Sequence, residues 1–152
     1  MKGVYILIIK KSESSYIKVG SFGDFEFPKG YYLYVGSALG RSTSIENRLG
    51  RHFRNNKKIH WHIDYLINEK NTEITKAFYA KTTKKLECDL FQALNKSSNY
   101  FNILIKDFGS SDCKEHCGSH LLYANNVQNL DLQSYLQKGF LSINLKMQQY
   151  SE

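Results

Sequence analysis

The chain has 152 residues, the size of one ordinary domain, and 41% of them are hydrophobic, enough for a core that needs no disulfide or metal to fold. Its formal net charge of +7 and its eleven Tyr, nine Phe and one Trp favour a polyanionic partner, because neutralised phosphates release counterions and aromatic faces stack on bases. The apolar run MKGVYILIIKK is too short to span a bilayer and has no small-residue cleavage site, and three cysteines suit a reducing compartment, so we expect a cytoplasmic protein without a membrane partner.

The N-terminal third of the chain predicts three strands. Residues 3–9 form a continuous apolar run with β-branched members, which indicates a buried strand. Shorter runs at residues 16–19 and 31–35 indicate two more strands, the last of them dense in aromatic residues. Turn-type residues separate these runs at residues 20–24 and 28–30.

A helix is expected next. Thr43 and Glu46 have the spacing of a capping box, in which each side chain satisfies a backbone N–H that the helix leaves unpaired. Ile45, Leu49 and Phe53 are spaced by four and form an apolar stripe that a helix would bury.

The rest of the chain alternates between the two kinds of element. Residues 59–67 are expected to be mostly helical, residues 73–80 a strand, and residues 84–94 a helix that buries Leu86, Leu90 and Leu94. Residues 99–106 are expected to add an edge strand. We therefore expect an α+β fold with a small, mainly antiparallel sheet flanked by helices, in one domain over residues 1–152 with a looser extension over residues 124–152.

Two tyrosines, an arginine and a glutamate could together hydrolyse a phosphodiester. Tyr5 lies in the first predicted strand, Tyr34 in the third, and Arg48 and Glu87 in the two helices. Hydrolysis needs an activated water, a cation beside the non-bridging oxygens and help for the leaving oxygen. Arginine offers phosphate a fixed fork of donors, and one carboxylate can hold Mg²⁺. A tyrosine can be the base only if its pKa falls well below about 10.

These motifs resemble those of the GIY-YIG nucleases, a family that includes UvrC-type excision nucleases and intron homing endonucleases. The name-giving motifs appear as GVY at residues 3–5 and YVG at residues 34–36, the R-x-x-x-H motif as Arg48 to His52, and the metal-binding glutamate as Glu87 in LECDL. YVGSALG, RLGRH, HWHIDYL, FGSSDC and SHLLY resemble, more narrowly, the Uri-type branch. The resemblance covers about residues 1–123.

The resemblance implies a metal-dependent endonuclease that leaves a 5′-phosphate and a 3′-hydroxyl. Tyr5 would be the general base or would position the attacking water, and Tyr34 would share that task. Arg48 would stabilise charge on the phosphate oxygens, and His52 could relay a proton. Glu87 would be the sole protein ligand to Mg²⁺ or Mn²⁺.

DNA is the expected substrate, in repair or recombination, and RNA is not excluded. Gly36 would let the protein backbone approach the phosphate. The side chains expected to contact nucleic acid are Ser37, Arg41, Arg51, Arg54, Lys57, Lys58, His60 and His62. A solvated basic face, and a packed Trp61 with hydrogen-bonded histidines beside it, are the competing interpretations. A homodimer or a repair-protein partner would fit a domain of this size.

Two departures from the family pattern concern catalysis more than fold. The name-giving motifs are farther apart than in most members, so residues 16–30 would have to form a hairpin excursion that keeps both tyrosines on one sheet face. The late active-site Asn has no clear match: Asn95, Asn99 and Asn102 are candidates, and Asp112 could replace it. The alternative function is therefore a nucleic-acid-binding module that keeps the fold without turnover.

Cysteines and histidines also cluster near the end of the motif-bearing region. Cys113, His116, Cys117 and His120 lie within eight residues and are ligand types that suit Zn²⁺. The cluster has no second, well-separated ligand pair, and Cys88 could complete a set only if the fold brings it near. A packed turn with inert, reduced cysteines is the preferred interpretation, so Zn²⁺ is not expected.

Overall fold

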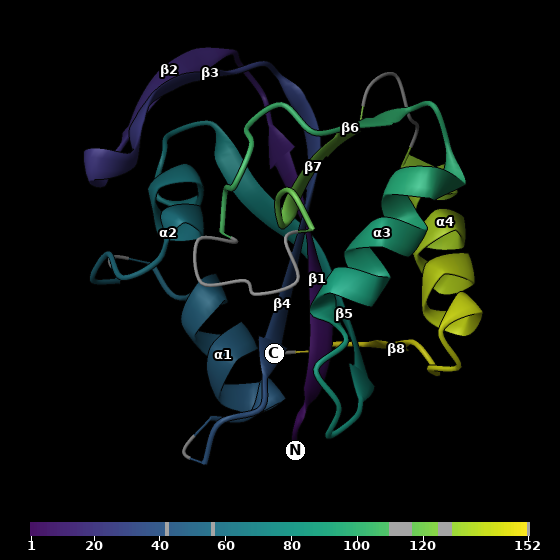
Figure 1. Ribbon diagram of the computed structural model, residues 1–152. Coiled ribbons are helices and arrows are strands. Elements are labelled where there is room, and N and C mark those ends of the chain that lie inside the picture. The colour runs from purple at the N-terminus through teal and green to yellow at the C-terminus, as the bar shows by residue number, and fades with distance from the viewer. Residues whose placement is uncertain (42, 56, 110–116, 125–128, 152) are drawn as a thin grey trace.

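The fold is a six-stranded antiparallel sheet covered by helices on both faces (Figure 1). The computed structural model describes residues 1–41, 43–55, 57–109, 117–124 and 129–151. The sheet has the order β6-β7-β4-β1-β5-β8, and every neighbouring pair is antiparallel. Its strands are β1 (Gly3–Lys11), β4 (Gly30–Ala38), β5 (Thr72–Lys81), β6 (Phe101–Asn102), β7 (Leu121–Ala124) and β8 (Gln148–Gln149). The expected α+β class is thus confirmed.

The remaining elements surround this sheet. A separate hairpin is formed by β2 (Ser15–Val19) and β3 (Gly23–Phe27), with the short 3-10 helix η1 (Gly20–Phe22) between them. The helices are α1 (Ile45–Phe53), α2 (His62–Ile67), α3 (Glu87–Ser97) and α4 (Asn129–Ser142). In the described residues, no helix is long and apolar enough to cross a membrane.

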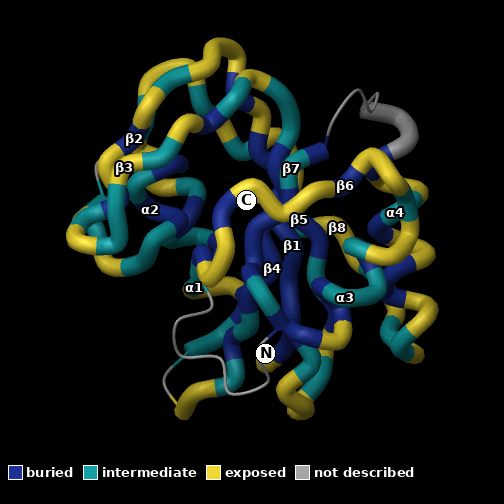
Figure 2. The backbone as a smooth tube through the Cα atoms, turned by 45° about the horizontal axis from the view of Figure 1, so that its top comes forward, coloured by how far each residue is buried: buried dark blue, intermediate teal, exposed yellow. Residues whose placement is uncertain are grey.

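Side chains of β1 alternate between two hydrophobic cores, because successive residues of a strand point to opposite faces. Tyr5, Leu7 and Ile9 belong to the core shared with α1, α2 and the β2-β3 hairpin. Val4 and Ile6 belong to the core shared with α3 and α4. Figure 2 shows β1 and β4 as mostly buried segments at the centre of the molecule. The continuous apolar run that predicted a buried strand is explained by burial on both faces.

The C-terminal extension is part of the folded core where it is described. Leu132, Leu136 and Phe140 lie one turn apart on α4, and each is fully buried. The helix packs so closely on α3 that a Cβ added to Gly139 would lie 3.0 Å from Leu94 Cδ2. The expectation of a looser tail is therefore wrong for residues 129–142, whose spacing by four already carried the signal of a packed helix.

The first helix begins differently from the prediction. Its N-cap is Ser44, whose hydroxyl accepts a hydrogen bond of 3.0 Å from the Asn47 backbone N–H. Thr43 instead donates its hydroxyl to the Gly40 carbonyl at 3.3 Å. The Glu46 carboxylate binds the N-terminal ammonium at 2.9 Å. The predicted capping box is wrong by one residue, because Ser and Thr are equally able caps and stand side by side in the sequence.

Most other strand predictions are confirmed, and several boundaries move. The hairpin expected within residues 16–30 is present as β2-β3, although β3 begins inside the predicted turn. Only His62–Ile67 of residues 59–67 is helical, and only Phe101–Asn102 of residues 99–106 is a strand. The helix predicted from residue 84 begins at Glu87, so Leu86 precedes it and is only partly buried.

Candidate active site

The register of the two central strands places both predicted tyrosines on one face of the sheet. Tyr5 pairs with Gly36 across β1 and β4, and Leu7 pairs with Tyr34. Tyr5 and Leu7 are two residues apart, so their side chains share a face, and cross-strand partners share it too. Tyr5 and Tyr34 are therefore diagonal neighbours on the face that packs against α1 and α2.

Gly36 is required by the Tyr5 ring that lies across it. A Cβ added at Gly36 would lie 2.5 Å from both the Cζ and the hydroxyl oxygen of Tyr5. That ring occupies the space in which we expected the protein backbone to approach a phosphate. The structure thus gives the second name-giving motif a physical reason that the sequence did not reveal: its glycine accommodates the tyrosine of the first.

The predicted catalytic side chains line one small cavity of about 200 Å³. Tyr5, Tyr34, Arg48 and Glu87 all border it, although they come from two strands and two helices. The other lining residues are Gly36, Ser37, Trp61, Lys85, Gly109 and His120. Of these, Trp61, Lys85, Gly109 and His120 were not among the predicted site residues, since only tertiary folding brings them to the tyrosines.

Glu87 reaches the cavity around the edge of the sheet. It is the first residue of α3, a helix that covers the face opposite to α1. The described pairing of β4 with β7 covers only Tyr31 to Tyr34, and beyond it the Val35 N–H donates to the His120 carbonyl at 2.9 Å. The end of β4 is therefore bordered by an irregular segment instead of a strand, and side chains from both faces can meet there.

His52 is the hydrogen-bond partner of Tyr5. The Tyr5 hydroxyl lies 2.9 Å from Nε2 of His52, and both residues are almost fully buried. Burial raises the pKa of Tyr5 to about 12, against the opposing charge of Arg48. Burial likewise lowers the pKa of His52 to about 3 and raises the pKa of Tyr34. At neutral pH all three groups are uncharged, so the lowered tyrosine pKa that we expected for a base is absent in the ligand-free protein.

Three buried polar atoms around this site have no hydrogen-bond partner in the part of the chain that the structure describes: Arg48 Nε, His52 Nδ1 and Glu87 Oε2. Such orphaned groups are costly and point to a missing partner. Arg48 and Glu87 carry opposite charges and line the same cavity, yet neither takes part in an ion pair among the described residues. A carboxylate that is 8% exposed with an unpartnered oxygen fits a divalent cation, and an unpaired guanidinium beside it fits an anion.

A second layer of residues orients Arg48. Its guanidinium carbon lies 4.9 Å from the ring centroid of Trp61, and that of Arg51 lies 4.3 Å from the same centroid. Arg51 is held by two hydrogen bonds to the fully buried Asp64 carboxylate, at 3.0 and 2.8 Å. The same carboxylate accepts the backbone N–H groups of His60 and Trp61, at 2.8 and 2.9 Å. Arg51, which we expected to contact nucleic acid, thus forms an internal ion pair with Asp64.

The hydrogen bonds to Asp64 decide its charge. Burial alone would raise the pKa of this carboxyl, but the Arg51 guanidinium and the two backbone N–H groups outweigh burial and hold the pKa below its usual value. Asp64 is therefore ionised at neutral pH, as the ion pair requires.

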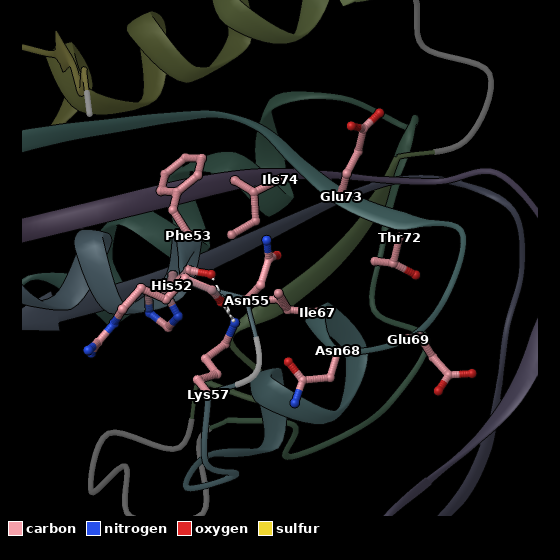
Figure 3. Close-up of a pocket in the computed structure, with 11 residues that line it drawn as sticks. His52, Phe53, Asn55, Lys57, Ile67, Asn68, Glu69, Thr72, Glu73 and Ile74 are labelled. Atoms are coloured by element: carbon pink, nitrogen blue, oxygen red, sulfur yellow. Dashed lines mark hydrogen bonds between the residues drawn. The ribbon is translucent and has the colours of Figure 1, made fainter.

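Other predicted contact residues lie away from the cavity. The Lys57 ammonium donates to the carbonyls of His52 and Arg54, at 3.0 and 2.9 Å, and so caps the end of α1 (Figure 3). This lysine and Arg54 border a hollow of about 560 Å³ that α1, α2 and β5 enclose. An adjoining hollow of about 540 Å³ is lined by basic side chains, those of Arg51, Arg54, Lys57, Lys58 and His60.

Of the remaining residues predicted to contact nucleic acid, some lie at the cavity and others do not. Ser37 lines the cavity, whereas Arg41 is exposed and does not. His62 accepts the Gly109 N–H at Nδ1, 3.1 Å away, and its ring stacks on Phe22 with centroids 4.5 Å apart. His62 thus supports the cavity wall at Gly109.

The asparagine that the family pattern requires is not found at the cavity among the described residues. Asn99 and Asn102 are exposed, Asn95 is partly exposed on α3, and none of the three lines the cavity. Asp112, the proposed replacement, lies outside the described residues, as do Cys113 and His116.

The comparisons with known proteins place the chain in a family without assigning it an activity. Residues 4–140 match the family model described as Domain of unknown function DUF123. No curated protein and no solved structure matches the sequence. Since the match covers almost the whole of the chain, from the second residue of β1 to the end of the buried part of α4, the protein belongs to the DUF123 domain family.

Proposed function

We propose that this protein is a divalent-metal-dependent endonuclease of the GIY-YIG type that hydrolyses phosphodiester bonds in DNA. One observation carries the proposal: the buried Glu87 carboxylate and the partly buried Arg48 share a cavity with two tyrosines, and each has a polar atom without a partner among the described residues. This is the set of groups that phosphodiester hydrolysis needs. The net charge of +7 agrees with a polyanionic substrate.

The metal assignment follows from Glu87. Mg²⁺ and Mn²⁺ are hard cations that take oxygen ligands and need only one or two protein carboxylates. When bound, such an ion supplies charge neutralisation at the phosphate and an acidified water. Glu87 would hold it. Arg48 would bind the non-bridging oxygens opposite, with its guanidinium kept in place by the Trp61 ring.

The role of Tyr5 follows from its hydrogen bond to His52. A neutral imidazole can accept a hydrogen bond from the phenol at Nε2, and His52 is neutral because it is buried. In the proposed reaction the Tyr5 oxygen would position the attacking water by accepting a hydrogen bond from it. Because burial keeps both Tyr5 and His52 neutral, the ion held by Glu87 would supply the acidity of that water, whose proton would leave to solvent.

A second candidate is a nucleic-acid-binding module without turnover. It is favoured by the absence of an asparagine from the lining of the cavity within the described part of the chain. Such a module would bind DNA with a steep salt dependence and leave it intact. With either function we propose a cytoplasmic location, because a reducing compartment keeps cysteines as thiols.

The deciding experiment is a cleavage assay on plain, flapped and branched DNA and on matched RNA, with Mg²⁺ or Mn²⁺. We expect metal-dependent cutting of DNA by the wild type and a loss of on the order of 100-fold or more in Glu87→Gln and Arg48→Ala. Asp89→Asn is the matched control, because it removes one exposed carboxylate from the same helix turn and should cut like the wild type.

The outcomes separate the two candidates. Salt-sensitive binding with every substrate intact would replace the nuclease by the module. Cutting that survives Glu87→Gln would exclude Glu87 as the metal ligand. Cutting of RNA in preference to DNA would keep the chemistry and correct the substrate.

A further inference from the structure

Two cysteines and a histidine that could bind a soft metal ion lie together beside the cavity. The fold brings Cys88 from α3 next to Cys117 and His120, which are 29 and 32 residues later in the sequence. The Sγ atoms of both cysteines and one ring nitrogen of His120 all lie within 4.8 Å of one another, and all three residues are buried. Sequence reasoning set Zn²⁺ aside unless the fold brought Cys88 near, and the fold does so.

The distance between Cys88 and His120 matches that between two ligands of a zinc site. With Zn–S about 2.3 Å and Zn–N about 2.0 Å, two ligand atoms of a tetrahedral site lie about 3.5–3.8 Å apart. Cys88 Sγ and His120 Nε2 are 3.7 Å apart. Two thiolates and an imidazole select zinc over magnesium or calcium, which take oxygen ligands. These three residues therefore favour a different metal ion from that proposed for the Glu87 carboxylate, although Glu87 directly precedes Cys88.

The turn between Cys117 and His120 is held in shape before any metal binds. Gly118 has φ +94°, a conformation that residues with a Cβ rarely adopt, and it folds the chain back so that both ligands face Cys88. The backbone N–H of Asp107 donates to the Gly118 carbonyl at 2.7 Å, and that of His120 to Phe108 at 2.8 Å. The buried Ser119 hydroxyl accepts the Leu121 N–H at 3.1 Å.

We propose that Cys88, Cys117 and His120 supply three ligands to a Zn²⁺ ion that fastens the start of α3 to the 117–120 turn. The site does not depend on the proposed nuclease activity. The zinc site would nevertheless affect the geometry of the proposed active site. Glu87 directly precedes Cys88 in the sequence, and His120 lines the same cavity as Glu87. A zinc ion at this point would fix the Glu87 carboxylate relative to Tyr34.

The test measures metal directly on the full-length protein. Purified protein is stripped with a chelator under reducing conditions and titrated with Zn²⁺ and, separately, with Co²⁺ as a spectroscopic substitute. We expect one equivalent of Zn²⁺ per chain and thiolate-to-cobalt charge-transfer absorption, which reports sulfur ligation without any mutation. Protein that takes up no zinc, or cobalt-loaded protein without that absorption, overturns the proposal.

Three variants and two controls locate the site. Cys88→Ser, Cys117→Ser and His120→Asn should each weaken Zn²⁺ binding by more than the 10–100-fold typical of losing a residue that merely supports a ligand. Leu90→Ala removes a buried side chain from the same helix without touching a ligand, so folded Leu90→Ala protein should bind zinc like the wild type. Glu87→Gln should also keep zinc while losing nuclease activity, so the two proposals fail separately. Unchanged zinc affinity in Cys88→Ser or Cys117→Ser would refute the assignment.

Discussion

Replacing Gly36 by alanine tests the packing on which the candidate site depends. The added Cβ would lie 2.5 Å from Cζ and the hydroxyl oxygen of Tyr5 and 2.9 Å from its Cε2. Carbon atoms in contact normally stay about 3.5–4.0 Å apart, so the ring must move by about 1 Å or more. Tyr5 is 1% exposed, so its ring can move only toward the small cavity that it borders. We expect a loss of about 1–3 kcal/mol from overpacking, plus part of the Tyr5–His52 hydrogen bond.

The assay is urea unfolding of wild type and variants, followed by circular dichroism. Gly50→Ala is the matched control: it adds the same methyl group in α1, where the nearest atom is the Tyr150 hydroxyl at 3.7 Å. In a helix interior this change should stabilise the protein by about 0.5–1 kcal/mol. The two glycine substitutions are thus predicted to have opposite signs.

The ring can be identified as the cause by a double-mutant cycle. In a Tyr5→Phe background the cost of Gly36→Ala should persist, because Cζ remains 2.5 Å away. In a Tyr5→Ala background it should vanish, because nothing then occupies the space. A cost of Gly36→Ala that is the same in all three backgrounds would contradict this account and locate the requirement for glycine in the backbone.

Three further changes probe the surroundings of the site. The pKa of His52 is about 3 in the folded protein and about 6.5 in the unfolded chain, so its NMR signals should not titrate between pH 5 and 8. Because the unfolded chain binds the proton more readily, the protein should lose stability as the pH falls below about 6.5. His52→Gln should reduce this pH dependence in urea unfolding experiments. Asp64→Asn removes the negative charge that pairs with Arg51 and should cost about 3 kcal/mol, at the low end for a broken buried pair because Arg51 is 17% exposed. Because the Asp64 pKa is lowered by folding, its stabilisation is complete above about pH 4 and is lost as the pH falls toward the folded pKa, a loss that Asp64→Asn should abolish in acid titrations. Leu136→Ala should cost about 2–5 kcal/mol in the same melts if α4 belongs to the core, and a cost near zero would restore the loose tail.

The sequence by itself determined the elements whose patterns are local. Three local patterns each predicted an element that is present: the apolar run of β1, the aromatic run of β4, and the stripe of Ile45, Leu49 and Phe53 in α1. Such patterns are readable because the buried face of a helix or strand makes hydrophobic residues recur with the period of that element. The boundaries were less certain, as at Ser44, because neighbouring residues cap a helix almost equally well. The candidate site residues were chosen from sequence through the resemblance to the GIY-YIG nucleases, since each of them taken singly also fits a purely structural role.

Only the tertiary structure decided how these residues meet. The pairing of Tyr5 with Gly36, the ion pair of Arg51 with Asp64, and the approach of Cys88 to His120 join positions 13 to 32 residues apart in the chain, and no local period encodes them. The charge states depend on folding for the same reason. A tyrosine or histidine has its ordinary pKa in an exposed chain, and it is burial of Tyr5 and His52 in the same core that leaves both neutral.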